Sequence, residues 1–172
     1  MALQNSSTGE KNGAKPLDQI DLHILHLLVA DPRRSQRSLA KEVGLSPSAV
    51  SERINQLEER GVITGYTTTV DLSKLGLPIS VYIGISCELG IDHVAQSRQL
   101  TEIPEVESVV LTTGEFDLLL KINVCDMTHL NEVLFTKLIE GGRGLSRSHS
   151  MVSLKEFKQA DYVSKMVERL MD

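Results

Sequence analysis

A set of polar side chains recurs along one face of a short segment, where together they could read the edges of DNA bases. Residues 46–61, SPSAVSERINQLEERG, place Val50, Ile54 and Leu57 at the spacing of a helix with one buried face. The opposite face then carries Ser48, Ser51, Glu52 and Asn55. Hydroxyl and amide groups near a helix N-terminus can approach bases and phosphates, and a carboxylate can accept from cytosine N4. This pattern favours base contact, chiefly by Ser48 and Asn55, over a merely solvated face.

A preceding short helix and a tight turn are expected to hold that face in place. Leu39 and Val43 fall at helical spacing, and Gly44 suits the position just past a helix end because glycine readily takes a positive φ. Ser46 can cap the second helix, with Pro47 at its first position, where no N–H is needed. Two helices joined in this way predict a helix-turn-helix, whose second helix enters the major groove. An ordinary helical hairpin is the alternative.

The charges are divided unevenly along the chain. Residues 1–62 carry eight Lys/Arg and eight Asp/Glu, whereas residues 63–172 carry ten and fifteen, so the net charge of −5 belongs to the second part. The neutral first part can still present a basic face to DNA, formed by Arg33, Arg34, Arg37, Lys41 and Arg53. Arg53 lies on the flank of the second helix, where it could contact a phosphate or brace the fold. The candidate DNA-binding residues are therefore Arg37, Ser46, Ser48, Ser51, Glu52, Arg53 and Asn55.

The first part of the chain is predicted to contain an arm, a DNA-binding domain and a connector. Residues 1–15 are polar and predict a disordered arm. Residues 16–64 predict a winged helix-turn-helix domain that begins with a helix over residues 16–30. Residues 65–78 are expected to form a connecting strand and hinge, because the run from Ile63 to Val70 is rich in β-formers and turn residues follow.

The second part alternates strand and helix patterns. Strands are predicted at residues 79–87, 106–112, 116–124 and 145–154, helices at 92–102 and 127–140, and a glycine-rich turn at 141–144. The order β-α-β-β-α-β is the ferredoxin-like arrangement, here covering residues 79–158. Residues 159–172 add a C-terminal helix. The fold class is therefore α+β, with a helical DNA-binding domain followed by a ferredoxin-like domain.

Composition argues against several classes of protein. No apolar run is long enough to span a membrane, and the polar N-terminus does not look like a secretory signal, so a cytoplasmic protein is expected. Cys87 and Cys125 fall in strand-like runs and predict buried thiols, with no disulfide framework, metal site or cofactor. The histidines His93, His129 and His149 lie far apart in sequence, and no nucleophile context stands out, so no enzyme is expected.

Four motifs resemble the Lrp/AsnC family of bacterial and archaeal transcription regulators. They are LDQIDLHILHLL, RRSQRSLAKEVGLSPSAVSERINQLEERGVITGY, DLSKLGL and TTGEFDLLLKI, in this order, and the resemblance covers about residues 16–158. It implies a winged helix-turn-helix followed by a ferredoxin-like amino-acid-sensing domain. It also implies homodimers joined through their sheets, often assembled into octamers, whose binding to double-stranded DNA responds to a small molecule.

The resemblance also implies a site for an amino-acid effector between the sensing domains of neighbouring dimers. The matching positions are the turn Gly114, Glu115, Phe116 and Asp117, and Ser148 and Ser150 where the family has Thr-x-Thr on its last strand. A glycine turn offers N–H groups to a carboxylate, and Asp117 or Glu115 can pair with an ammonium. Alternatively, Gly114 only makes the tight turn and Asp117 only caps it.

Two other functions remain open at this point. A haem-pathway decarboxylase resembles this family in overall architecture and would bind a tetrapyrrole among His and Arg side chains. An amino-acid sensor with a vestigial DNA domain would act through protein partners instead. The well-formed helix after Ser46 favours the DNA-binding regulator.

Overall fold

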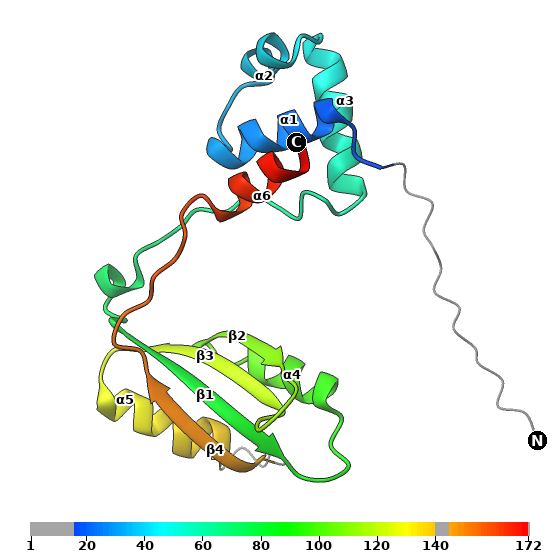
Figure 1. Cartoon of the computed structure of the whole chain (residues 1–172). Helices are drawn as coiled ribbons and strands as arrows, with labels where there is room; N and C mark the ends of the chain where they lie inside the picture. The colour runs from blue at the N-terminus through cyan, green and yellow to red at the C-terminus, as the bar shows by residue number, and fades with distance from the viewer. Residues whose placement is uncertain (1–15, 140–144, 172) are drawn as a thin grey trace, which may run out of the picture. The chain divides into compact units, whose positions relative to one another are not determined.

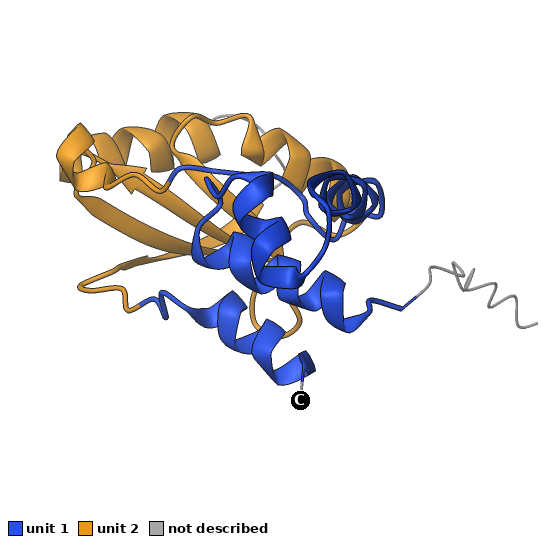
Figure 2. Cartoon of the chain, turned by 90° about the horizontal axis from the view of Figure 1, so that it is seen from above, with its two compact units in different colours: residues 1–68, 158–172 blue, residues 69–157 orange. Residues whose placement is uncertain are grey.

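The chain folds into two compact units. The computed structural model describes residues 16–139 and 145–171 (Figure 1). One unit contains residues 16–68 and 158–171 and the other contains residues 69–157, coloured separately in Figure 2. The predicted arm at 1–15 and the glycine-rich turn at 141–144 lie outside the described residues.

The first unit is helical in its described part, and its helices begin and end where local sequence requires. Its helices are α1 (Gln19–Ala30), α2 (Gln36–Val43), α3 (Pro47–Glu59) and α6 (Tyr162–Met171). Ser46 accepts a hydrogen bond from the Ala49 N–H at the start of α3, and Gly44 after α2 has a φ of 73°. The predicted cap and the predicted turn glycine are therefore confirmed.

One apolar core joins all four helices of the first unit. It is built from Leu22, Ile24, Leu25, Leu27, Leu28, Leu39, Ala40, Val50, Ile54, Leu57 and Val167. The C-terminal helix is part of this core, because Val167 is buried and Ser164 hydrogen-bonds to His26 of α1. The chain thus returns from the second unit to complete the first.

The second unit is a four-stranded antiparallel sheet with helices packed on one face. Its elements are β1 (Ile79–Cys87), α4 (His93–Thr101), β2 (Val106–Leu111), β3 (Leu118–Val124), α5 (Met127–Glu132) and β4 (Leu145–Val152). The strand order is β2-β3-β1-β4, which confirms the predicted ferredoxin-like topology. Alternate residues of β1 and β3 point into a core shared with α4, α5 and the π-helical turns at Val133–Ile139, and the other alternate residues face the uncovered side.

Two local expectations differ from the structure. The predicted strand over residues 65–70 is absent: residues 64–70 form no helix or strand, and Leu72–Leu75 form a 3-10 turn. β-formers make a strand only when a partner supplies hydrogen bonds, and within the described residues none does so here. Cys125 is exposed rather than buried, because it follows the last residue of β3, and Cys87 is only half-buried.

None of the described helices has the length and apolar character needed to cross a membrane.

Candidate DNA-binding helix and ligand loop

Helix α3 has one buried face and one face open to solvent. Val50, Ile54 and Leu57 are at most 8% exposed and pack in the core of the helical unit. The exposed side carries Ser48, Glu52 and Asn55, while Ser51 is half-buried and Arg37 of α2 is exposed. The predicted orientation of the helix is therefore the observed one, and its polar residues are available to a partner.

The hydroxyl groups at the start of α3 form a small hydrogen-bonded group. The Ser46 and Ser48 Oγ atoms lie 3.0 Å apart, and Ser51 Oγ accepts from Gln36 Nε2 at 3.2 Å. The amide of Asn55 has no hydrogen-bond partner among the described residues. A free amide that projects from an exposed helix face can donate and accept at an adenine edge.

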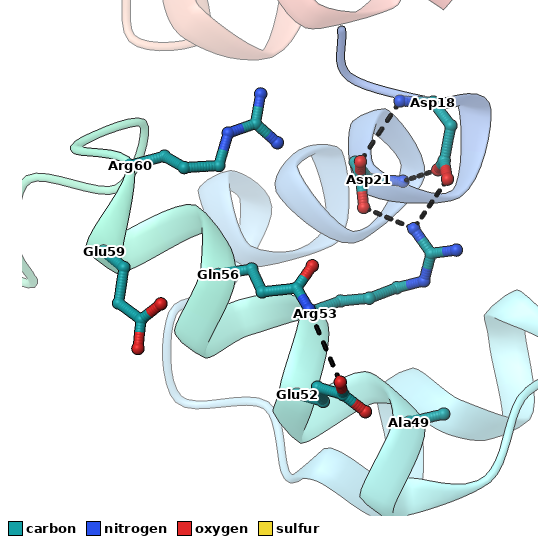
Figure 3. Close-up of a pocket in the computed structure, with 8 residues that line it drawn as sticks. All are labelled: Asp18, Asp21, Ala49, Glu52, Arg53, Gln56, Glu59 and Arg60. Carbon is teal, nitrogen blue, oxygen red and sulfur yellow. Dashed lines mark hydrogen bonds and ion pairs between the residues drawn. The ribbon is translucent and has the colours of Figure 1, made fainter. Parts of the chain in front are cut away.

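Arg53 points away from that face and binds the start of α1 (Figure 3). One guanidinium nitrogen donates to Asp18 Oδ2 at 2.7 Å and to Asp21 Oδ1 at 2.6 Å. Asp18 also caps α1, and the hydrogen bond from the Asp21 N–H, followed by that from Arg53, lowers the pKa of Asp18. The two carboxylates in turn raise the pKa of Arg53. Of the two roles predicted for Arg53, these contacts support the bracing role.

A pocket of about 440 Å³ lies beside this ion-pair group. Its lining comes from α1, α3 and the residues that flank them: Asp18, Asp21, Ala49, Glu52, Arg53, Gln56, Glu59 and Arg60. Figure 3 shows Gln56 directed to Glu52, with Nε2 and Oε1 3.5 Å apart. Acidic side chains outnumber basic ones here, so this side of α3 is poorly suited to phosphates.

The loop of residues 112–117, which contains the predicted effector-binding turn and is here called the ligand loop, is a tight turn tied to the end of β1. Gly114 has a φ of 120°, which disfavours any residue with a side chain. The Asp117 N–H donates to the Ile85 carbonyl at 2.9 Å, and Asp117 Oδ2 accepts from the Cys87 N–H at 2.8 Å. Asp117 therefore links this loop to the end of β1, and one of its carboxylate oxygens is already engaged. Its role toward a ligand stays a prediction.

The Phe116 ring covers Gly84 in the middle of β1. A Cβ at Gly84 would lie 2.5 Å from the ring, so only glycine leaves room for Phe116 in this position. The ring also lies 6.1 Å from the His149 ring of β4, and Glu115 pairs with Arg147 at 3.3 Å. The ligand loop and β4 thus meet on the uncovered face of the sheet.

Ser148 and Ser150 lie on the opposite face of the sheet from Phe116. They pair with Ile85 and Ile83, whose side chains point into the core, whereas His149 pairs with Gly84. Both serines are exposed at the edge strand. The predicted ligand residues therefore form two groups within one chain, one on each face. Arg147 and His149 were not predicted from the sequence to be neighbours of the ligand loop. Only the register between β1 and β4 brings them there, and that register cannot be read from the sequence.

Burial raises the pKa of the Cys87 thiol, and the nearby Asp117 carboxylate raises it further. Both effects favour the thiol over the thiolate in the metal-free protein, and a cation bound to the sulfur would displace the thiol proton. The imidazole of His93, the first residue of α4, also lies near the Cys87 thiol.

Two family descriptions match the two parts of the chain. Residues 17–64 match the winged helix-turn-helix DNA-binding family, and residues 80–163 match the Lrp/AsnC ligand-binding domain. A leucine-responsive regulatory protein from Haemophilus influenzae is 33% identical over 156 residues, covering 90% of this chain and 93% of the relative. The HTH-type transcriptional regulator FL11 from Pyrococcus horikoshii is 33% identical, covering 84% and 93%.

Solved structures agree with these matches. AsnC from E. coli superposes with a TM-score of 0.77 at 26% identity, covering 84% of this chain and 97% of that one. A transcriptional regulator from Neisseria meningitidis, solved as a complex with L-Met, gives a TM-score of 0.75 at 28% identity, covering 84% and 94%.

Proposed function

Because this chain belongs to the Lrp/AsnC family of DNA-binding transcription regulators, we propose that α3 reads its operator and that the ligand loop binds a free amino acid that adjusts DNA binding. The observation that carries the proposal is the division of α3 into a buried apolar face and an exposed polar face. The two halves of the proposal are supported by different units of the chain.

At the DNA, Asn55 and Ser48 are proposed to contact base edges, and Arg37 a phosphate. Asn55 and Arg37 make no side-chain contacts that DNA would have to break among the described residues. Ser46, Ser51 and Glu52 flank them, with Ser46 as helix cap as well. Arg53 is left out of the proposed contacts, since its guanidinium is held by Asp18 and Asp21.

At the ligand loop, the proposed effector is an amino acid bound between neighbouring copies of the chain. Backbone N–H groups near Gly114 and the Arg147 guanidinium suit a carboxylate, while Glu115 suits an ammonium group. A neighbouring copy would have to complete the site, because Ser148 and Ser150 lie on the other face of this chain's sheet. The neisserial relative bound to L-Met supports this class of ligand.

The proposal also includes assembly. We propose homodimers that join through the uncovered sheet face and associate further into octamers, acting in the cytoplasm without enzymatic activity. A dimer would present two α3 helices to successive major grooves, and several dimers would supply the avidity that a neutral DNA-binding unit needs. The effector would then act by shifting the balance between assemblies.

Capture of genomic DNA tests the proposed function. Sheared DNA from the source organism is mixed with the purified full chain at ~0.15 M salt, near physiological ionic strength, with excess competitor DNA. The capture is run with and without a mixture of L-amino acids. We expect a few enriched fragments whose yield changes with the mixture. Enrichment that does not change when amino acids are added would contradict the proposed effector response. No enrichment at all would contradict the proposed role as a DNA-binding regulator.

A further inference from the structure

Three side chains with metal-binding atoms converge where β1 ends, beside the ligand loop. They are Cys87 at the last position of β1, His93 at the first position of α4, and Asp117 immediately before β3. The thiol sulfur, one imidazole nitrogen and one carboxylate oxygen all lie within 4.8 Å of one another, and all three residues are half-buried. We propose that these three residues bind a thiophilic divalent cation, with Zn²⁺ as the best fit.

The backbone holds all three residues in place, so the convergence does not depend on long flexible side chains. Asp117 is anchored twice, by its N–H to Ile85 and by its Oδ2 to the Cys87 N–H. Asp92 caps α4 by accepting from the Val94 and Ala95 N–H groups, which fixes His93 in the first turn. A carboxylate has acceptor sites on both oxygens, so Asp117 can keep its hydrogen bond and still coordinate a cation.

The donor set selects the class of metal. Zn²⁺ binds thiolate sulfur at about 2.3 Å and imidazole nitrogen or carboxylate oxygen at about 2.0–2.2 Å, in a tetrahedron whose corners are thus roughly 3.5 Å apart. Ligand atoms already within 4.8 Å reach that spacing by side-chain movements on the order of 1 Å. Ca²⁺ and Mg²⁺ take oxygen ligands and have little affinity for a thiol.

Three protein ligands leave one corner of the tetrahedron for water or another small ligand. The bound cation would link β1, α4 and the ligand loop, because each contributes one ligand. The metal-binding claim does not rest on the proposed amino-acid effector, and its test needs neither DNA nor an amino acid.

Cobalt substitution tests the site directly. The full chain, prepared without a histidine tag and freed of metal by a chelator, is titrated with Co²⁺ and then with Zn²⁺. We expect one Co²⁺ per chain, visible bands of a tetrahedral site, a thiolate-to-Co²⁺ charge-transfer band, and loss of both on adding Zn²⁺. Absence of the charge-transfer band in the wild-type protein would overturn the proposal.

The second thiol provides a matched control. Cys125 is exposed, and its sulfur lies 3.3 Å from His129 Nδ1, so it is the competing position for a cation. We expect C87S to lose the charge-transfer band and C125S to keep it; the reverse result would refute the site. H93A truncates a half-buried side chain in the first turn of α4, where alanine is a good helix former, so the variant should fold. It should weaken Co²⁺ binding at least about tenfold, the loss typical of even an outer-shell partner. Unchanged affinity in H93A would exclude His93 and with it the proposed geometry.

Discussion

Replacing Arg53 with methionine should destabilise the helical unit without changing its contact with DNA. Methionine keeps an unbranched stem and removes the guanidinium that donates to Asp18 and Asp21. The side chain of Asp21 is only 11% exposed, so its carboxylate would lose a partner in a poorly hydrated position, whereas Asp18 is 36% exposed. The two carboxylates would keep their hydrogen bonds from backbone N–H groups but would have lost their positively charged partner.

The size of the effect lies between two known limits. Exposed ion pairs contribute about 0–1 kcal/mol, and removing one partner of a fully buried pair costs about 3–5 kcal/mol. With Arg53 28% exposed, we expect a loss of about 2 kcal/mol. For a unit of this size that corresponds to a fall in Tm of roughly 10 °C.

Thermal unfolding followed by circular dichroism, with Arg37→Met as the matched control, measures this loss. Arg37 is exposed and has no partner among the described residues, so its replacement should change stability by less than about 0.5 kcal/mol.

The pKa of Asp18 is lowered in the folded state, so the Arg53 contribution is present above the unfolded pKa of about 3.9. The Arg53 contribution is lost as the pH falls through the folded pKa of Asp18. At that pH the free energies of unfolding of the wild-type and Arg53→Met proteins should become equal.

Measurements of DNA binding distinguish the two roles predicted for Arg53, a phosphate contact and a brace of the fold. The salt dependence is the slope of the logarithm of the operator-binding constant against the logarithm of the salt concentration. Arg37→Met should reduce this slope by about one unit. Arg53→Met, measured well below its Tm, should leave the slope unchanged. A stable Arg53→Met protein with a reduced slope would refute the reasoning and place Arg53 on a phosphate.

Three further predictions concern the second unit. Gly84→Ala should displace the Phe116 ring and cost about 1–3 kcal/mol, seen in urea unfolding; an unchanged midpoint would contradict the contact. Burial alone would raise the pKa of Glu105, but its hydrogen bonds, chiefly from Lys137, lower it overall. Its contribution to stability should therefore be present above a pH of about 4.3 and lost as the pH falls through the folded pKa, and Glu105→Gln should flatten this acid-side loss in unfolding curves. Asp117→Ala should abolish the amino-acid-dependent change in sedimentation, and a retained change would exclude Asp117 from the response.

The parts of the fold that local sequence controls could be predicted. The spacing of Val50, Ile54 and Leu57 defines the buried face of α3 by geometry alone, and Ser46 caps a helix using atoms only three residues away. Strict alternation in β1 and β3 likewise indicated strands with one face in a core.

Contacts between distant segments could not be predicted in the same way. Nothing in the sequence near Arg53 indicates that Asp18 and Asp21 are its partners, because the crossing of α1 and α3 brings them together. His149 reaches Phe116 only through the register of β4 on β1, and a shift of one residue would put it on the other face. Cys87, His93 and Asp117 have no motif spacing and converge only in the folded chain.

The most direct test of α3 as the sequence-reading element is the ratio of operator affinity to competitor affinity for Asn55→Ala. Asn55 is exposed and lacks a partner among the described residues, so its replacement should leave the fold intact. We expect operator affinity to fall by about 1–3 kcal/mol with competitor affinity unchanged, whereas Arg37→Met should weaken both equally. Equal weakening of both DNAs by Asn55→Ala, or no weakening of either, would contradict the account.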